Sequence, residues 1–375
     1  MVKQCGKSTY NVNYTFKVLY ALGIMFIVMG HCNNGGFSVL NEFFPFRTFY
    51  LGLFVFASGY FYNQENELNV KQFIIKKFKK LIIPLYLWNF FYGFVLHIIK
   101  IYGFFPKVHV NLENLLLTPI IHGHQFVLNL AGWFIVPLFM IHIINILIRK
   151  SFKILNVEIN EFFFFGIMLL MGFAGVTLSA HGYNNSWYLV LDRVLYFLPF
   201  YALGINYKKY EKYDKIDKIK YFSVILLLSL IIIYKYGSMP SVTPSWAKFY
   251  TSNVIKPFYT CMLGIAFWLR ISKILTPAIG NSRTINLLAN NTYTIMINHL
   301  AGFMILKSVF AILSKYTKYC SNFDLVSYKT NIWYFYLPHN LSQFLVLYVI
   351  TGIIFSIIFQ NFIKYLYKKF IYKYI

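Results

Sequence analysis

Residues 16–31 of the chain read FKVLYALGIMFIVMGH, an apolar run in which Lys17 is the only Lys, Arg, Asp or Glu. A helix needs about 20 mostly apolar residues to cross the hydrocarbon core of a bilayer, and this run continues without further charge to residue 38. No small-residue cleavage pattern follows it, so we expect a first membrane helix and no cleaved signal peptide.

The same pattern recurs along the whole chain. Of the 375 residues, 58% are hydrophobic and only 12% are charged, and the mean hydropathy of +0.57 is far above that of a soluble protein. We therefore predict an all-α, polytopic transmembrane helix bundle of about ten spans, forming one domain over residues 1–375. The predicted spans are 17–38, 43–62, 82–103, 126–148, 161–181, 187–206, 220–236, 253–271, 285–312 and 334–363.

The charge of the chain is strongly basic, with 35 Lys and Arg against 11 Asp and Glu. The cations fall in short clusters between apolar runs, which is typical of membrane topology signals and argues against nucleic-acid binding. If the N-terminus is cytoplasmic, 24 of the 35 cations lie on inside segments. We therefore predict that both termini are cytoplasmic. The richness in Lys, Asn, Ile and Tyr is typical of an AT-rich bacterial genome, so we expect a bacterial plasma membrane.

Metal and disulfide chemistry is not indicated. The four cysteines are far apart and show no Cys/His ligand spacing, which predicts free thiols and no metal site. The His122–His124 pair lacks a third ligand in the sequence, and we interpret it, with Glu42 and Glu113, as part of solvated outer loops. The cysteines are Cys5, Cys32, Cys261 and Cys320.

Ionisable residues inside predicted spans are costly to insert, so each one is a candidate for function. His31, late in the first span, could act as a general base because a neutral imidazole accepts a proton near neutral pH. His299 lies in the ninth span, Arg47 at the outer end of the second, and Asp192 and Arg193 in the sixth. The alternatives are hydrogen bonds within the bundle for the histidines and interfacial snorkelling for the arginines.

A basic strip precedes the third span. Lys76, Lys77, Lys79 and Lys80 surround Phe78 and lead into a span with Pro84 near its start. Such a strip could bind the phosphates of a soluble donor, and it could equally attract anionic lipid headgroups.

Six segments together resemble the membrane acyltransferase family three, integral membrane O-acyltransferases that act on surface carbohydrates. The resemblance extends over nearly the whole chain and includes the Gly-His end of the first span, a "SGY" segment in the second and the basic strip. The segments are 23–31, 53–61, 76–84, 132–134, 197–204 and 291–299. Two departures concern donor binding: Tyr20 stands where the family commonly has Arg, with Lys17 as a possible substitute, and the basic strip contains only Lys.

The resemblance implies transfer of an acyl group from acetyl-CoA or another acyl-CoA to a hydroxyl of a cell-surface or lipid-linked polysaccharide. His31 would be the general base or an acyl relay, and His299 and Arg193 would position substrate or stabilise the oxyanion. Predicted substrate contacts are Arg47, Asp192, Ser58 and Trp133. Predicted donor contacts are Lys17, Lys76, Lys77, Lys79 and Lys80. The alternatives are a polysaccharide transporter without acyl chemistry, with Pro199 as a candidate helix break, and a structural partner in a synthase complex.

Overall fold

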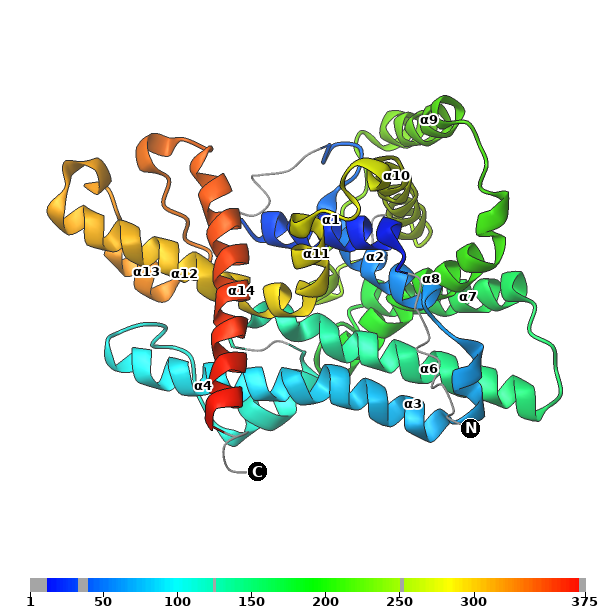
Figure 1. Cartoon of the computed structure of the whole chain (residues 1–375), viewed down its shortest axis with the longest axis horizontal. Helices are drawn as coiled ribbons and strands as arrows, with labels where there is room; N and C mark the ends of the chain where they lie inside the picture. The colour runs from blue at the N-terminus through cyan, green and yellow to red at the C-terminus, as the bar shows by residue number, and fades with distance from the viewer. Residues whose placement is uncertain (1–11, 33–39, 124–125, 250–252, 371–375) are drawn as a thin grey trace, which may run out of the picture.

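The computed structural model describes residues 12–32, 40–123, 126–249 and 253–370. These residues form helices and no β-strand, and one isolated β-bridge joins Thr243 to Lys248 (Figure 1). The α-helices are α1 (Tyr14–His31), α2 (Phe46–Tyr60), α3 (Val70–Lys77), α4 (Ile83–Ile101), α5 (Thr118–Ile121), α6 (Ile135–Ile154), α7 (Glu161–Ala180), α8 (Ser186–Tyr210), α9 (Lys218–Tyr236), α10 (Lys256–Ile279), α11 (Arg283–Asn290), α12 (Thr292–Tyr316), α13 (Leu325–Thr330) and α14 (Phe344–Phe370). Shorter π and 3₁₀ segments are η2 (Gln64–Leu68), η3 (Phe78–Ile82), η4 (Glu113–Leu117), η5 (Leu130–Phe134), η6 (Glu211–Tyr213), η7 (Pro244–Trp246), η8 (Lys318–Cys320) and η9 (Pro338–Asn340).

Nine helical segments among the described residues are long and apolar enough to cross a membrane. The helix α2 has only 15 residues, but it runs antiparallel to α1. The ring of Phe16 stacks on Tyr60 with centroids 3.9 Å apart, and the ring of Phe26 lies 4.8 Å from Phe46. Because the start of each helix contacts the end of the other, α2 crosses the same thickness as α1. This confirms the all-α polytopic bundle; the cytoplasmic placement of the termini stays a prediction.

The bounds of the predicted spans and of the helices differ along the whole chain, and three of these differences change the course of the chain. The third predicted span begins earlier, because the basic strip is itself helical and the segments α3, η3 and α4 continue from Val70 to Ile101. The ninth is divided at Asn291 into α11 and α12. The tenth begins only at Phe344, since Pro338 and two residues with positive φ, His339 and Asn340, precede it. Residues 33–38 of the first predicted span lie outside the described residues.

Side chains cap several of these helices at the position where the sequence has Asn or Asp. The side chain of Asn13 accepts a hydrogen bond from the backbone N–H of Phe16, and Asn160 and Asp217 cap α7 and α9 in the same way. Such caps satisfy backbone N–H groups that have no partner within the helix. They therefore define where these spans begin.

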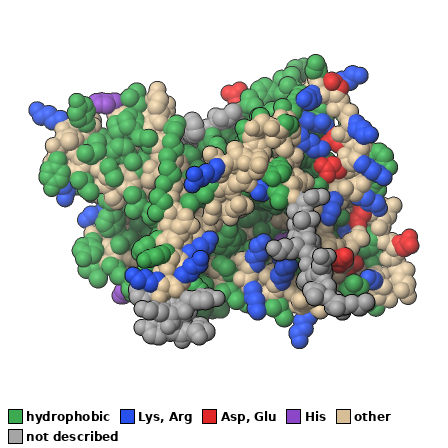
Figure 2. All heavy atoms as spheres, in the orientation of Figure 1, with side chains coloured by type: hydrophobic (Ala, Val, Ile, Leu, Met, Phe, Trp, Pro, Cys, Tyr) green, Lys and Arg blue, Asp and Glu red, His purple; other side chains and the backbone are tan. Residues whose placement is uncertain are grey.

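The outer surface of the bundle is apolar. The helix α9 exposes a run of large hydrophobic side chains, among them Val224, Leu227 and Ile231. Figure 2 shows hydrophobic side chains over large parts of one face, with Lys and Arg more frequent than acidic residues between them. A surface of this kind fits contact with lipid acyl chains, where exposed apolar groups cost nothing.

Buried charges at the Lys17 end of the bundle are paired. Arg149 donates two hydrogen bonds to Glu161, at 3.0 and 2.5 Å, and both side chains are buried. Nearby, Asp214 lies between α8 and α9 and accepts hydrogen bonds from Lys273, Tyr207 and Arg270. Burial alone would raise the pKa of the Asp214 carboxyl, but these hydrogen bonds and the cations bring it below its usual range.

Glycine contacts hold α2 directly against α8. A Cβ atom on Gly204 would lie 2.0 Å from the backbone oxygen of Phe56, and one on Gly59 would lie 2.0 Å from that of Tyr201. Small residues allow membrane helices to approach backbone to backbone. The glycine of the sequence Ser58-Gly59 therefore serves the contact between α2 and α8.

We predict that Gly204→Ala lowers the thermal midpoint of the detergent-solubilised protein, because the added methyl forces the helices apart at a cost of about 1–3 kcal/mol. The matched control is Gly166→Ala in α7, where a Cβ meets nothing within 4 Å and alanine should stabilise the helix slightly. Equal midpoints for the two variants would contradict the close contact.

Candidate active site

Two histidines from distant parts of the sequence meet inside the bundle. His31 is the last residue of α1, and its Nδ1 lies 3.1 Å from Nε2 of His299 in α12. Each ring is also anchored to its own helix: His31 Nδ1 lies 2.8 Å from the oxygen of Ile27, and His299 Nδ1 lies 2.9 Å from that of Ile295. His299 is fully buried, whereas His31 is half-buried.

These contacts determine the tautomer of each neutral ring. A carbonyl oxygen only accepts hydrogen bonds, so His299 carries its proton on Nδ1 and its Nε2 accepts. His31 Nδ1 faces two acceptors, the Ile27 oxygen and His299 Nε2, and therefore carries the proton of its own ring. Nε2 of His31 is left as an unprotonated nitrogen, and no hydrogen bond to it is found among the described residues. The pair thus presents His31 Nε2 as a base.

A cavity of about 240 Å³ opens at His31; we call it the outer cavity. It is rich in aromatic side chains, and the ring of Trp333 stacks on His31 with centroids 5.9 Å apart. Its lining is Gly30, His31, Arg47, Tyr50, Leu130, Ala131, Trp133, Thr243, Pro244, Ser245, Trp246 and Trp333.

A second cavity, of about 450 Å³, lies toward the Lys17 end of the bundle; we call it the inner cavity. It is mainly apolar, with Lys80 as its one Lys or Arg among the described residues, and it contains Tyr20 at the position of the missing family Arg. Its lining is Tyr20, Ile24, Ile27, Phe54, Ser58, Lys80, Leu81, Phe134, Ile135, Leu138, Ala289, Asn290, Thr292, Tyr293 and Met296.

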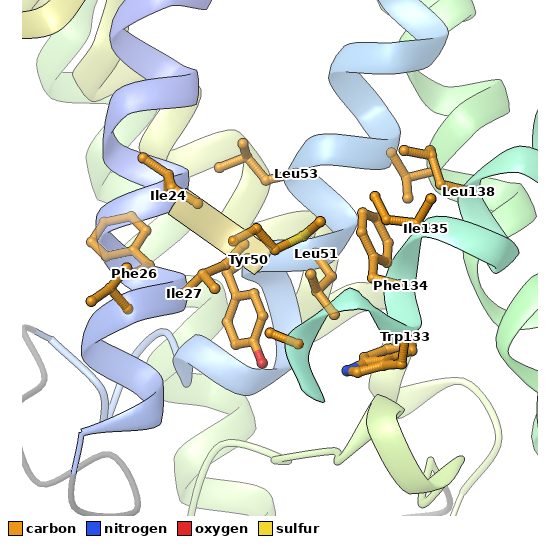
Figure 3. Close-up of a cluster of buried hydrophobic side chains, with 14 of the residues drawn as sticks. Ile24, Phe26, Ile27, Tyr50, Leu51, Leu53, Trp133, Phe134, Ile135 and Leu138 are labelled. Atoms are coloured by element: carbon orange, nitrogen blue, oxygen red, sulfur yellow. The ribbon is translucent and has the colours of Figure 1, made fainter. Parts of the chain in front are cut away.

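The two cavities lie end to end near the histidine pair. On α1 the inner lining ends at Ile27 and the outer lining begins at Gly30, about one helical turn later. On η5 the change falls between Trp133 and Phe134. Figure 3 shows the packed side chains of this boundary, with the rings of Tyr50 and Trp133 gathered at one end of the cluster. A layer of apolar side chains about one turn thick therefore separates the cavities.

Arg193 is buried behind the wall of the outer cavity and does not line it. Its guanidinium donates to the backbone oxygens of His122, at 2.9 Å, of Pro244, at 3.3 Å, and of Ser245. Its Cζ atom lies 4.5 Å from the centre of the Trp133 ring. Arg193 thus fixes two parts of the cavity wall, Trp133 and the loop with Pro244 and Ser245, which is a different arrangement from direct contact with an oxyanion.

Asp192, the residue before Arg193, does not line the outer cavity. The side chain is fully buried, lines neither cavity, and neither carboxyl oxygen has a hydrogen-bond partner among the described residues. The predicted contact of Asp192 with substrate therefore has no geometric support.

The lysines predicted to bind the donor differ in their surroundings. Lys80 lines the inner cavity, while Lys76 and Lys79 are exposed outside it. Lys77 lies 3.1 Å from Nε2 of His142, whose Nδ1 lies 3.0 Å from the hydroxyl of Tyr201. Lys17 donates to Asn286 of α11. The segment η3 is a π-helical turn, which changes the direction of side chains along the strip and is frequent at functional sites.

Of the predicted substrate contacts, Arg47 and Trp133 line the outer cavity and Ser58 lines the inner one. Asn298 is a helix-packing residue, since its side chain accepts a 2.6 Å hydrogen bond from Tyr92. His124 lies outside the described residues, as does Cys5, and the remaining three cysteines are free thiols. No group of three or more His, Cys, Asp or Glu suited to a metal is found in the described part of the chain.

The sequence interpretation missed Lys307, a fully buried residue of α12. Its ammonium donates a 2.5 Å hydrogen bond to the oxygen of Ile332 and lies 5.0 Å from the centre of the Phe335 ring. Between these two residues stands Trp333, which stacks on His31. Lys307 therefore holds the segment that covers the histidine, and only its burial in an apolar span could have marked it.

A half-buried histidine base between two cavities of a helix bundle is an arrangement suited to group transfer within a membrane. Residues 13–361 match the family model described as "Acyltransferase domain", so the chain belongs to acyltransferase family 3. It is a multi-pass membrane acyltransferase, which confirms the family resemblance and favours enzymatic chemistry over the transporter alternative. Consistent with this, α8 continues through Pro199 without a break. No curated protein and no solved structure matches the chain significantly.

We predict that Lys307→Met lowers acyltransferase activity by about 10- to 100-fold, because a small displacement of a positioned group has effects of that size. The Met side chain fills the same space, so the protein should remain folded in size-exclusion chromatography. Lys315→Met, an exposed lysine later on the same helix, serves as the control. Unchanged activity of Lys307→Met would show that the Trp333 segment needs no such anchor.

Proposed function

We propose that this protein transfers an acyl group from acetyl-CoA, or another acyl-CoA, to a hydroxyl of a cell-surface or lipid-linked polysaccharide in a bacterial plasma membrane. The observation that carries the proposal is the position of the His31–His299 pair at the junction of two cavities. A donor entering one cavity and an acceptor entering the other would meet at this pair.

The donor is assigned to the inner cavity. Its apolar walls suit the pantetheine arm and acyl group, and the ammonium of Lys80 at its edge suits a phosphate of CoA. The predicted orientation supports this assignment, because the cation-rich end of the bundle would face the cytoplasm. Lys76 and Lys79 would add attraction at longer range from outside the cavity.

The acceptor is assigned to the outer cavity. Four aromatic rings line it, those of Tyr50, Trp133, Trp246 and Trp333. Aromatic faces pack against the apolar faces of sugar rings, and their polar edges remain free for hydrogen bonds. Arg47 and the hydroxyl of Tyr50 supply further donors to sugar oxygens.

The proton transfer follows from the tautomers. His31 Nε2 takes the proton of the acceptor hydroxyl as the oxygen attacks the thioester carbonyl. The positive charge that forms on His31 is stabilised by Nε2 of His299, which accepts the Nδ1–H hydrogen bond. When the C–S bond breaks, the imidazolium returns the proton to the CoA thiolate, so the ester and the thiol form together. We assign His299 and Arg193 as positioning residues for His31 and for the cavity wall.

We predict that His31→Ala abolishes transfer of label from radioactive acetyl-CoA to extracted glycan, a loss of at least about 100-fold for a general base. The variant should still elute as a folded protein in detergent. His299→Gln, which keeps an acceptor but not the ring, should retain partial activity. Full activity of His31→Ala would refute the assignment. Label trapped on wild-type protein without acceptor, and absent from His31→Ala, would identify an acyl relay instead.

We predict that Lys80→Gln raises KM for acyl-CoA about fivefold with little change in kcat, as expected for loss of one solvent-accessible charge contact of about 1 kcal/mol. Lys76→Gln is the matched control from the same strip and should change KM less than about twofold. A larger effect at Lys76 than at Lys80 would place the donor phosphates outside the inner cavity.

A further inference from the structure

The described lining of the outer cavity carries positive charge and no negative charge. Arg47 is its one Lys or Arg among the described residues, and none of the 11 acidic residues of the chain, all of which are described, lines it. The ion pairs found in the described part of the chain, Arg149–Glu161 and those of Lys273 and Arg270, join residues near the opposite end of the bundle. A ligand in the outer cavity therefore meets a cation and no carboxylate.

The position of Arg47 in the cavity wall favours the binding of an anion. Arg47 stands in the first turn of α2, where the partial positive charge of the helix N-terminus adds to its own. The side chain is half-buried beside His31 and Tyr50 in the cavity wall. A guanidinium has five N–H donors, so Arg47 can keep contacts with the protein and still offer a two-pronged site to a planar or tetrahedral anion.

The aromatic rings of the outer cavity strengthen the attraction between Arg47 and an anion. Trp133, Trp246 and Trp333 place apolar ring surface in the same cavity wall as Arg47, and a charge interaction is stronger where a bound ligand displaces water against such surface. A neutral sugar would offer the Arg47 guanidinium only neutral oxygen acceptors. A sugar with a carboxylate or phosphate would add a charge-assisted hydrogen bond, which is the stronger kind, while its ring packs on the indoles.

We propose that the acceptor is an anionic glycan, and that Arg47 binds a carboxylate or phosphate on the acylated sugar or its neighbour. This inference rests on the proposed function, since it names the class of acceptor for the same reaction. It makes Arg47 a specificity-determining residue, separate from the proton transfer at His31.

The first experiment changes the acceptor. Glycan is extracted from cells that express His31→Ala, deacylated with mild alkali and divided into three portions: untreated, carboxyl-reduced, and treated with hydrofluoric acid to remove phosphate. Each portion is added to membranes that contain the wild-type protein and radiolabelled acetyl-CoA. We expect label in the untreated glycan and a loss of at least about tenfold after one of the two treatments, the size expected for one charge-assisted contact.

The outcomes separate this inference from the proposed function. The treatment that removes acceptance identifies the anion as a carboxylate or a phosphate. Equal labelling of all three portions would overturn the anionic acceptor and leave acyl transfer to glycan intact. No label in the untreated portion would refute the proposed function, and the inference with it.

The second experiment changes the protein. Arg47→Gln should raise KM for the untreated glycan about tenfold, with kcat nearly unchanged, and Arg47→Lys should lie between Gln and wild type because it keeps the charge without the fork. Lys248→Gln removes an exposed cation near the loop 243–246 that lines the cavity and should change neither constant. A fall in kcat at unchanged KM for Arg47→Gln would assign Arg47 to the reaction step and overturn the inference.

Discussion

The structure depends on one constraint: a charge buried in a membrane bundle must find partners inside the protein. Arg193 donates to backbone oxygens of two separate loops, and Lys307 donates to the oxygen of Ile332. Both cations thereby hold short segments that lie between the long helices. These segments carry Pro244, Ser245 and Trp333, three residues of the outer cavity. The two buried cations therefore stabilise the wall of the outer cavity.

The histidine pair is also held by contacts with backbone carbonyl oxygens. Each ring is oriented by the carbonyl oxygen one turn earlier on its own helix, so the tautomers are set by the backbone of α1 and α12. A carboxylate is not needed to orient His31, because a neutral imidazole performs that role. In an apolar interior this avoids burying a negative charge beside the histidine pair.

The two cavities lie end to end along the bundle, on either side of a short apolar layer. Side chains about one turn thick, including Ile27 and Phe134, separate the two spaces. The close contact of α2 with α8 through Gly59 and Gly204 gives this region a rigid support.

The sequence by itself determined the membrane fold, because a span needs a long apolar run and a membrane leaves no other way to satisfy the backbone. It also marked His31, His299 and Arg193 as candidates for function, since an ionisable residue in such a run is conspicuous. Only the tertiary structure decided what these residues contact. Trp333 lies far from His31 in the chain, Arg193 turns to backbone oxygens instead of substrate, and Lys80 alone of its strip faces the inner cavity. Hydropathy records depth in the membrane, but contacts across the bundle depend on how the helices are rotated and packed, which no local pattern specifies.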